Sequence, residues 1–147
     1  MPLFHALQHA REELAAETGG LTAEQFWQRP HGLTPLGFHI RHIGGAAERL
    51  GSYLREEPLT PAQLAALKAE MEPGADRLTL LEALDAALAG LESYVRCLDP
   101  ATLADPRFVG RKQLPTSVIG LLTHIAEHTL RHVGQAVTTA RLIRSLA

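Results

Sequence analysis

Residues 116–145 read TSVIGLLTHIAEHTLRHVGQAVTTARLIRS and directly follow Pro115. Helices often begin at threonine or serine, because the side chain can accept a hydrogen bond from the first turn. The apolar residues that follow recur at the spacing of one α-helical face; they are Val118, Leu122, Ile125, Ala136, Ala140 and Ile143. The segment therefore predicts a long amphipathic helix that packs one face against a hydrophobic core.

Three other segments show the same helical periodicity. The first covers residues 3–17 and ends before a Thr-Gly-Gly sequence. The second begins with Thr34, a good N-cap residue, has proline in its first turn, and runs to Pro58. The third covers residues 78–98, has leucine and valine in heptad spacing, and ends at an Asp-Pro pair. Four such helices favour a fold in which helices pack on helices.

Shorter elements are predicted between these helices. Residues 21–28 predict one or two helical turns, and Thr60, followed by proline, can cap a short helix that extends to Met71. Residues 106–115 predict a loop with an extended stretch at 108–109, because no segment alternates long enough to indicate a strand. The sequence thus predicts an all-α, up-and-down-type four-helix bundle forming a single domain over residues 1–147. Its long connection between helices 2 and 3 contains a short extra helix.

The composition argues against several classes of protein. With 147 residues, of which 46% are hydrophobic and 20% charged, the chain has the make-up of one globular domain. The formal net charge is −2 and the 14 lysines and arginines are scattered, so nothing favours binding of nucleic acid. No run of about 18 apolar residues predicts a membrane span. The N-terminal stretch also lacks the apolar core of a signal peptide.

The chain has a single cysteine, Cys97, which cannot form an internal disulfide. This favours a reducing compartment, the cytoplasm. No basic cluster adjoins Cys97, so we expect a buried, unreactive thiol rather than a nucleophile.

The last predicted helix carries His124, His128 and His132 at intervals of four residues. Residues at this spacing lie on one helix face, so two imidazoles can reach one ion. All three span about 12 Å along the axis, which is too far for a single ion. At about 100° per residue, His132 falls within the apolar arc, His128 on its edge and His124 outside it. A metal in the bundle interior would therefore use His128 and His132; the alternative is a hydrogen-bonded or surface histidine stripe.

The second predicted helix offers His39 and His42 as candidates for a third ligand. The helical wheel places His39 nearer the centre of the apolar arc and His42 at its rim, so spacing alone leaves both open. Gly44 and Gly45 follow them, although glycine is a poor helix former. The two glycines indicate either the close approach of another helix beside the site or tight packing without a function.

Other polar residues near the histidines each have two interpretations. Glu127 and Gln135 can orient the imidazoles or simply face solvent. Three arginines flank the histidines and can attract an anionic thiol or serve as ordinary surface charges: Arg41, Arg49 and Arg131. The remaining histidines are not expected to bind metal, since two lie on a solvated face of the first helix and one in a loop: His5, His9 and His31.

The segments TPLGFHIRHIGGAAERL at residues 34–50 and HIAEHTLRHVGQ at residues 124–135 resemble the DinB/YfiT family. The family pattern has a histidine in the second helix and His-x-x-x-His in the last, followed by x-Gly-Gln; here valine stands where arginine is common. The resemblance covers nearly the whole chain. It implies a metal held by His42, His128 and His132. It selects His42 over His39, and leaves His39 and His124 as neighbours of the site.

The resemblance also implies a function. Members of the family are reported with zinc or nickel, and several are dimers. Characterised relatives transfer bacillithiol, mycothiol or similar low-molecular-weight thiols to electrophiles. We therefore expect a cytoplasmic, homodimeric, metal-dependent enzyme that acts on a small-molecule substrate with such a thiol as co-substrate. The alternatives are a metal-dependent hydrolase that uses a metal-bound water, and a non-catalytic metal-binding bundle linked to stress.

Overall fold

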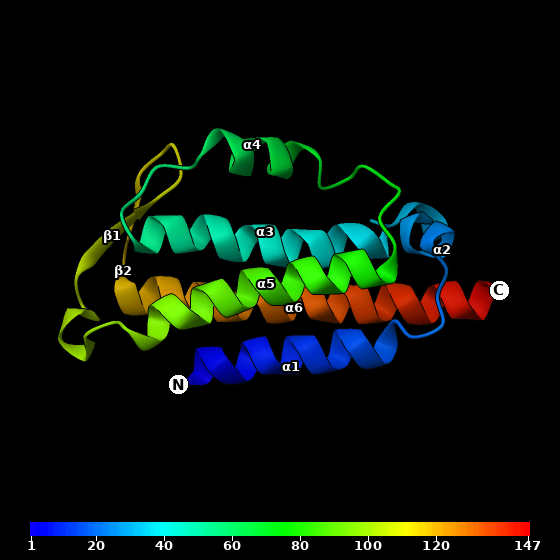
Figure 1. Ribbon diagram of the computed structural model, residues 1–147, viewed down its shortest axis with the longest axis horizontal. Coiled ribbons are helices and arrows are strands. Elements are labelled where there is room, and N and C mark those ends of the chain that lie inside the picture. The colour runs from blue at the N-terminus through cyan, green and yellow to red at the C-terminus, as the bar shows by residue number, and fades with distance from the viewer.

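The computed structural model describes residues 1–147 and shows the expected all-α bundle (Figure 1). Its long helices are α1 (Pro2–Glu17), α3 (Leu36–Leu54), α5 (Arg77–Arg96) and α6 (Val118–Leu146). The shorter elements are α2 (Ala23–Trp27), η1 (Pro30–Gly32), α4 (Pro61–Lys68), η2 (Pro100–Thr102), β1 (Pro106–Val109) and β2 (Leu114–Ser117). The long connection between α3 and α5 with its short extra helix is confirmed. No helix has both the length and the apolar composition of a membrane span.

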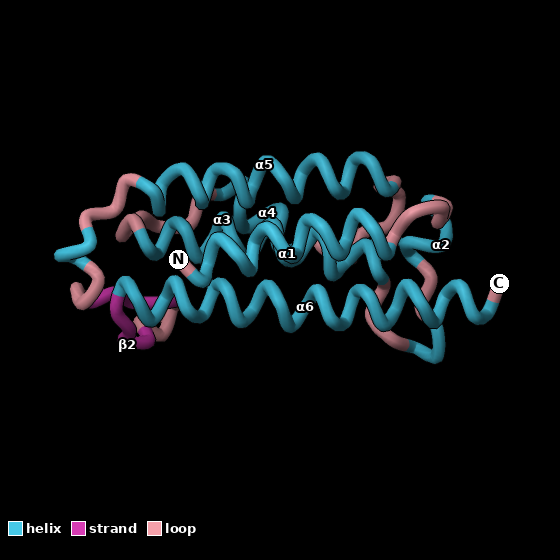
Figure 2. The backbone as a smooth tube through the Cα atoms, turned by 90° about the horizontal axis from the view of Figure 1, so that it is seen from below, coloured by secondary structure: helices cyan, strands magenta, loops and turns pink.

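The direction of the four long helices follows from that connection. The chain leaves α3 at one end of the bundle, returns through α4 along its length, and enters α5 at the other end (Figure 1). As a result α3 and α5 run in the same direction, with Gly44 beside Leu84 and Gly51 beside Leu91. In the orthogonal view α5 and α6 occupy opposite edges of the bundle, with α1 and α3 between them (Figure 2). The helix directions therefore do not simply alternate along the chain.

The helix starts mostly carry the caps that the sequence predicts. Ser117 accepts a hydrogen bond from the Gly120 amide at the start of α6, and Thr60 forms a capping box with Gln63 at the start of α4. The prediction that Thr34 caps the second long helix is wrong. Pro35 occupies the N-cap position, where no side chain accepts a hydrogen bond, because the helix begins one residue later, at Leu36.

The predicted loop before α6 is instead a β-hairpin. Strands β1 and β2 pair antiparallel, with Pro106 opposite Ser117 and Val109 opposite Leu114. Each strand has only four residues and buries no side chain fully, so the sequence contains no alternating pattern to detect. The Arg107 guanidinium donates to the carbonyl oxygen of Leu54 at 2.8 Å, which attaches the hairpin to the end of α3.

One continuous core of 25 buried apolar residues runs between the long helices. The predicted apolar face of α6 lies in this core, including Leu122, Ile125 and Ala136. The prediction that Cys97 is buried is wrong, because its side chain is exposed. Cys97 is the C-cap residue of α5, beyond the last buried position at Val95, so the heptad face no longer points toward the core there.

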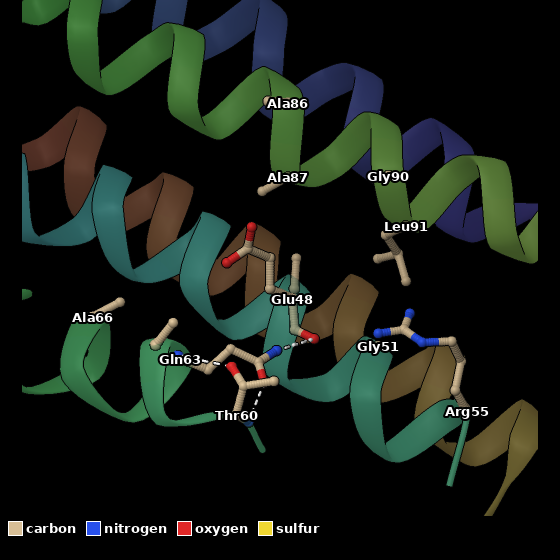
Figure 3. A pocket seen from close by; sticks show the side chains of 12 residues that line it. Glu48, Gly51, Arg55, Thr60, Gln63, Ala66, Ala86, Ala87, Gly90 and Leu91 are labelled. Carbon is tan, nitrogen blue, oxygen red and sulfur yellow. Dashed lines mark hydrogen bonds between the residues drawn. The ribbon is translucent and has the colours of Figure 1, made fainter. Parts of the chain in front are cut away.

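Helix α4 rests on the bundle without burying any of its side chains. A cavity of about 570 Å³ separates it from α3 and α5, and is lined largely by alanine and glycine (Figure 3). Gln63 crosses this space, and its amide donates to the carbonyl oxygen of Glu48 and to the hydroxyl of Ser52. Polar contacts rather than apolar packing therefore hold α4 in place.

Trp27 of α2 packs against α3 where Gly37 leaves room for its ring. The indole nitrogen donates to the carbonyl oxygen of Ala75 at 2.8 Å, and the Arg41 guanidinium lies over the ring at 4.7 Å. A Cβ added at Gly37 would lie 2.7–2.9 Å from ring atoms of Trp27. Glycine at this position thus permits a contact that links α2, α3 and the chain before α5.

We expect Gly37→Ala to lower the free energy of unfolding by about 1–3 kcal/mol, because the added Cβ overpacks the Trp27 ring. Gly134→Ala in α6 is the matched control, since nothing lies within 4 Å of its added Cβ. The control should gain up to about 1 kcal/mol from its higher helix propensity. Urea unfolding followed by circular dichroism measures both values, and equal stabilisation of the two variants would contradict this account of the packing.

Candidate metal centre

Three histidines gather between α3 and α6. His42 comes from α3, and His128 and His132 come from successive turns of α6; one nitrogen of each lies within 4.8 Å of the others. Nε2 of His42 is 3.3 Å from Nε2 of His128. The antiparallel packing of α3 against α6 brings His42 opposite the pair that the sequence places on one helix face. This group of donors could hold a divalent metal ion.

The surroundings of His128 and His132 favour the neutral forms of these two histidines. Burial, together with His132 and His42, lowers the pKa of His128 to about 4. Burial, with the nearby His42 and Arg131, also lowers the pKa of His132. Neutral imidazoles keep the nitrogen lone pair that a metal ligand requires. Imidazole nitrogens this close together, on rings of which His128 and His132 are neutral, suit a divalent cation placed between them.

A buried carboxylate fixes the proton on His42. Glu70 is only 4% exposed, and its Oε2 lies 2.7 Å from Nδ1 of His42. Burial opposes ionisation of Glu70, but the hydrogen bond with His42 and the charge of Arg49 outweigh it and lower its pKa. An ionised carboxylate can only accept, so Nδ1 of His42 donates, and the lone pair that a metal would use is the one on Nε2. That lone pair is on the nitrogen nearest His128.

Glu70 is held by an ion pair for which Gly45 makes room. Its second oxygen, Oε1, lies 2.8 Å from Nη1 of Arg49, at an angle that leaves Oε1 without a hydrogen bond. A Cβ on Gly45 would lie 2.8 Å from that nitrogen and 2.9 Å from that oxygen. Gly44 instead faces α5, where a Cβ would make ordinary contacts of 3.5–3.8 Å. The two glycines therefore differ, and Gly45 is the one next to the site.

Arg41 fixes the chain on both sides of Glu70. Its Nη1 donates to the carbonyl oxygens of Ala69, at 2.8 Å, and Glu72, at 2.7 Å. Arg41 and Arg49 are thus engaged inside the protein and are not ordinary surface charges. Arg131 is exposed and pairs with Glu127, one turn earlier in α6.

The other candidate residues lie outside the group of three. His39 is buried, and its Nδ1 lies 3.2 Å from Nδ1 of His132, so it contacts the ring from behind. Burial, with His132 and His42 nearby, lowers the pKa of His39 to about 4. When His132 donates its Nδ1 proton to the neutral His39, His132 Nε2 keeps its lone pair. His124 is exposed and lies 3.7 Å from Glu127.

Of the other residues predicted near the site, Gln135 contacts a histidine of the group and Glu127 does not. Gln135 shares a hydrogen bond with His132, which partly offsets the lowered pKa of that ring. Glu127 faces Arg131 and His124 instead, as the solvent-facing interpretation predicts. The histidines expected to stay away from the site do so: His5, His9 and His31. Glu70 could not be predicted as part of the site, because it lies in the long connection, where no periodicity distinguishes it from the neighbouring Glu72.

A cavity of about 210 Å³ opens beside the histidines. His42, His128 and the exposed His124 form one side. The other lining residues are Arg49, Tyr53 and four aliphatic residues: Ala46, Leu50, Leu59 and Leu67. Leu59 and Leu67 belong to the long connection, so that segment forms one wall. The cavity has room for a small molecule next to His42 and His128, two of the three histidines.

Fold and site together define a helical bundle with a three-histidine group between two of its helices. The family model of the DinB superfamily matches residues 6–136, so the chain belongs to that superfamily. Among solved structures, the crystal structure of a conserved protein from Enterococcus faecalis is similar, with a TM-score of 0.79 and 20% sequence identity. The similarity covers 96% of this chain and 94% of that chain, and it shows the shared fold. No curated protein matches the chain.

We expect His42→Ala to weaken zinc binding by more than about 100-fold, beyond the 10–100-fold effect typical of residues that only orient a ligand. His39→Ala should fall within that smaller range, because His39 contacts the back of His132, and His124→Ala should bind zinc as the wild type does. Competition with a chromophoric chelator measures all three affinities. A larger loss of zinc affinity in His39→Ala than in His42→Ala would show that His39, and not His42, is the ligand.

Proposed function

We propose that this protein is a metal-dependent enzyme in which His42, His128 and His132 bind a divalent ion, zinc or nickel. We propose further that it transfers a low-molecular-weight thiol to a small electrophilic substrate. The observation that carries the proposal is a group of three imidazoles with no fourth protein donor, two of which line a cavity. Structural zinc sites usually have four protein ligands, whereas catalytic sites have three and leave a position open.

Each residue of the site would have a distinct role in this reaction. His42, oriented by Glu70, and the neutral His128 and His132 would hold the ion. A divalent ion there would supply the positive charge that keeps a thiol in its nucleophilic thiolate form. The thiol proton would leave to solvent, a carbon–sulfur bond would form, and the leaving group would depart with its bonding electrons. Apolar walls formed by Leu50, Leu59 and Leu67 suit the body of a small electrophile.

The positions of two other histidines argue against a purely structural metal site. A structural site would need a fourth protein ligand, and His39 and His124 are the nearest candidates. His39 faces Nδ1 of His132 from behind, and His124 is exposed at the mouth of the cavity. An open position beside a cavity therefore supports catalysis. Hydrolysis is a close variant of the proposal, since water would use the same open position as the thiol.

We also propose a homodimer that works in the reducing cytoplasm. The dimer rests on the family resemblance. The location rests on the single cysteine and on the thiol chemistry, because low-molecular-weight thiols stay reduced in that compartment. The exposed Cys97 lies at the end of α5 and does not line the cavity, so the proposed reaction does not use it.

Thiol conjugation tests the proposal directly. Zinc-loaded and nickel-loaded protein should conjugate bacillithiol or mycothiol to monochlorobimane, and the metal-free protein should not. His128→Ala should lose at least about 100-fold in rate, because it removes one of three ligands, whereas His124→Ala should retain activity. Fluorescence of the conjugate reports the rate. Full metal loading without turnover of either thiol or of glutathione would exclude the transferase, and ester hydrolysis without thiol would favour the hydrolase.

A further inference from the structure

The connection between α3 and α5 is attached in an unusual way. Between residues 55 and 79 Glu70 is the only buried residue, and α4 within that stretch buries nothing. Apolar side chains hold most connections against a core, but here the buried group is a carboxylate. Such a group is costly to bury unless its partners are in place. Docking of the connection therefore depends on what Glu70 meets.

Glu70 meets one of the three histidines of the metal centre. Nδ1 of His42 donates to the carboxylate at 2.7 Å, and Arg49 lies 2.8 Å from its other oxygen. The opposite nitrogen of the same ring, Nε2, faces His128. The His42 ring thus contacts the connection, through Glu70, with Nδ1, and faces the candidate metal position with Nε2.

We propose that Glu70 is a positioning residue for His42, and that metal binding and docking of the connection are therefore coupled. The proposal rests on the proposed metal site. A carboxylate that accepts from Nδ1 fixes the ring tautomer and orientation and raises the basicity of Nε2. A cation on Nε2 in turn makes Nδ1–H a stronger donor to Glu70. Such coupling is reciprocal, so each event strengthens the other by the same factor.

The coupling would reach the cavity beside the histidines. Leu59, just before α4, and Leu67, in the last turn of α4, form part of its wall. When Glu70 is released, the segment after Leu67 loses its one buried side chain and keeps only the contacts of Arg41 with backbone carbonyls, whereas Gln63 still attaches the start of α4 to α3. The docked connection would thus complete the wall of the cavity in the metal-loaded protein. The effect should concentrate in residues 64–72.

Hydrogen exchange followed by mass spectrometry tests the coupling on the full chain with and without zinc. Zinc should slow amide exchange in residues 64–72 of the wild type, by between about 5-fold and 150-fold, the usual range of such couplings. Glu70→Gln should lose this protection and bind zinc about 10–100-fold more weakly. Glu72→Gln is the matched control, because its exposed side chain makes no contact with the site, and it should behave as the wild type does.

A second variant keeps every ligand and the carboxylate. Gly45→Ala places a Cβ 2.8 Å from Nη1 of Arg49 and 2.9 Å from Oε1 of Glu70, so the ion pair must move. Because alanine favours the helix, this variant should fold even if Glu70→Gln does not. It should lose the zinc-dependent protection of residues 64–72. Gly90→Ala, where nothing lies within 4 Å of the added Cβ, should keep it.

The outcomes separate this inference from the proposed function. If the wild type binds zinc but residues 64–72 exchange at the same rate with and without it, the coupling is wrong and the metal site stands. Unchanged zinc affinity and protection in both Glu70→Gln and Gly45→Ala would also overturn the coupling. If the wild type binds no zinc, nickel or other divalent ion, the proposed function fails, and the coupling fails with it.

Discussion

The antiparallel packing of α3 against α6 is the constraint on which the site depends. It places His42 opposite two histidines one turn apart, so that donors from positions far apart in the sequence share one small space. Close packing also withdraws His128 and His132 from water, which lowers their pKa values and favours their neutral forms. The same contact that builds the core thus prepares the histidines for a cation.

The long connection is the second part of this arrangement. It reverses the chain so that α5 runs parallel to α3, and on the way it carries Glu70 to the back of His42. Arg41 and Arg49 on α3 hold that segment, and Gly45 leaves the space that the ion pair between Arg49 and Glu70 requires. A single stretch of α3 therefore supplies a candidate ligand and the groups that fix its orientation.

Much of the fold could be predicted from the sequence, because in long amphipathic helices the apolar residues recur at the helical spacing. His128 and His132 could also be selected, since a helical wheel separates them from the exposed His124. The choice between His39 and His42 could not be made that way. It depends on how two helices cross, and the family resemblance chose His42. Glu70 and the β-hairpin escaped prediction, because one depends on a tertiary contact and the other is too short to show a pattern.

The most direct test of the central claim is a crystal structure of the zinc-loaded protein, with diffraction data collected on both sides of the zinc absorption edge. The account predicts one anomalous peak per chain, bonded to His42, His128 and His132, with an open position that faces the cavity lined by Leu50 and Leu67. A peak between His5 and His9, or one bonded to His39 in place of His42, would contradict it.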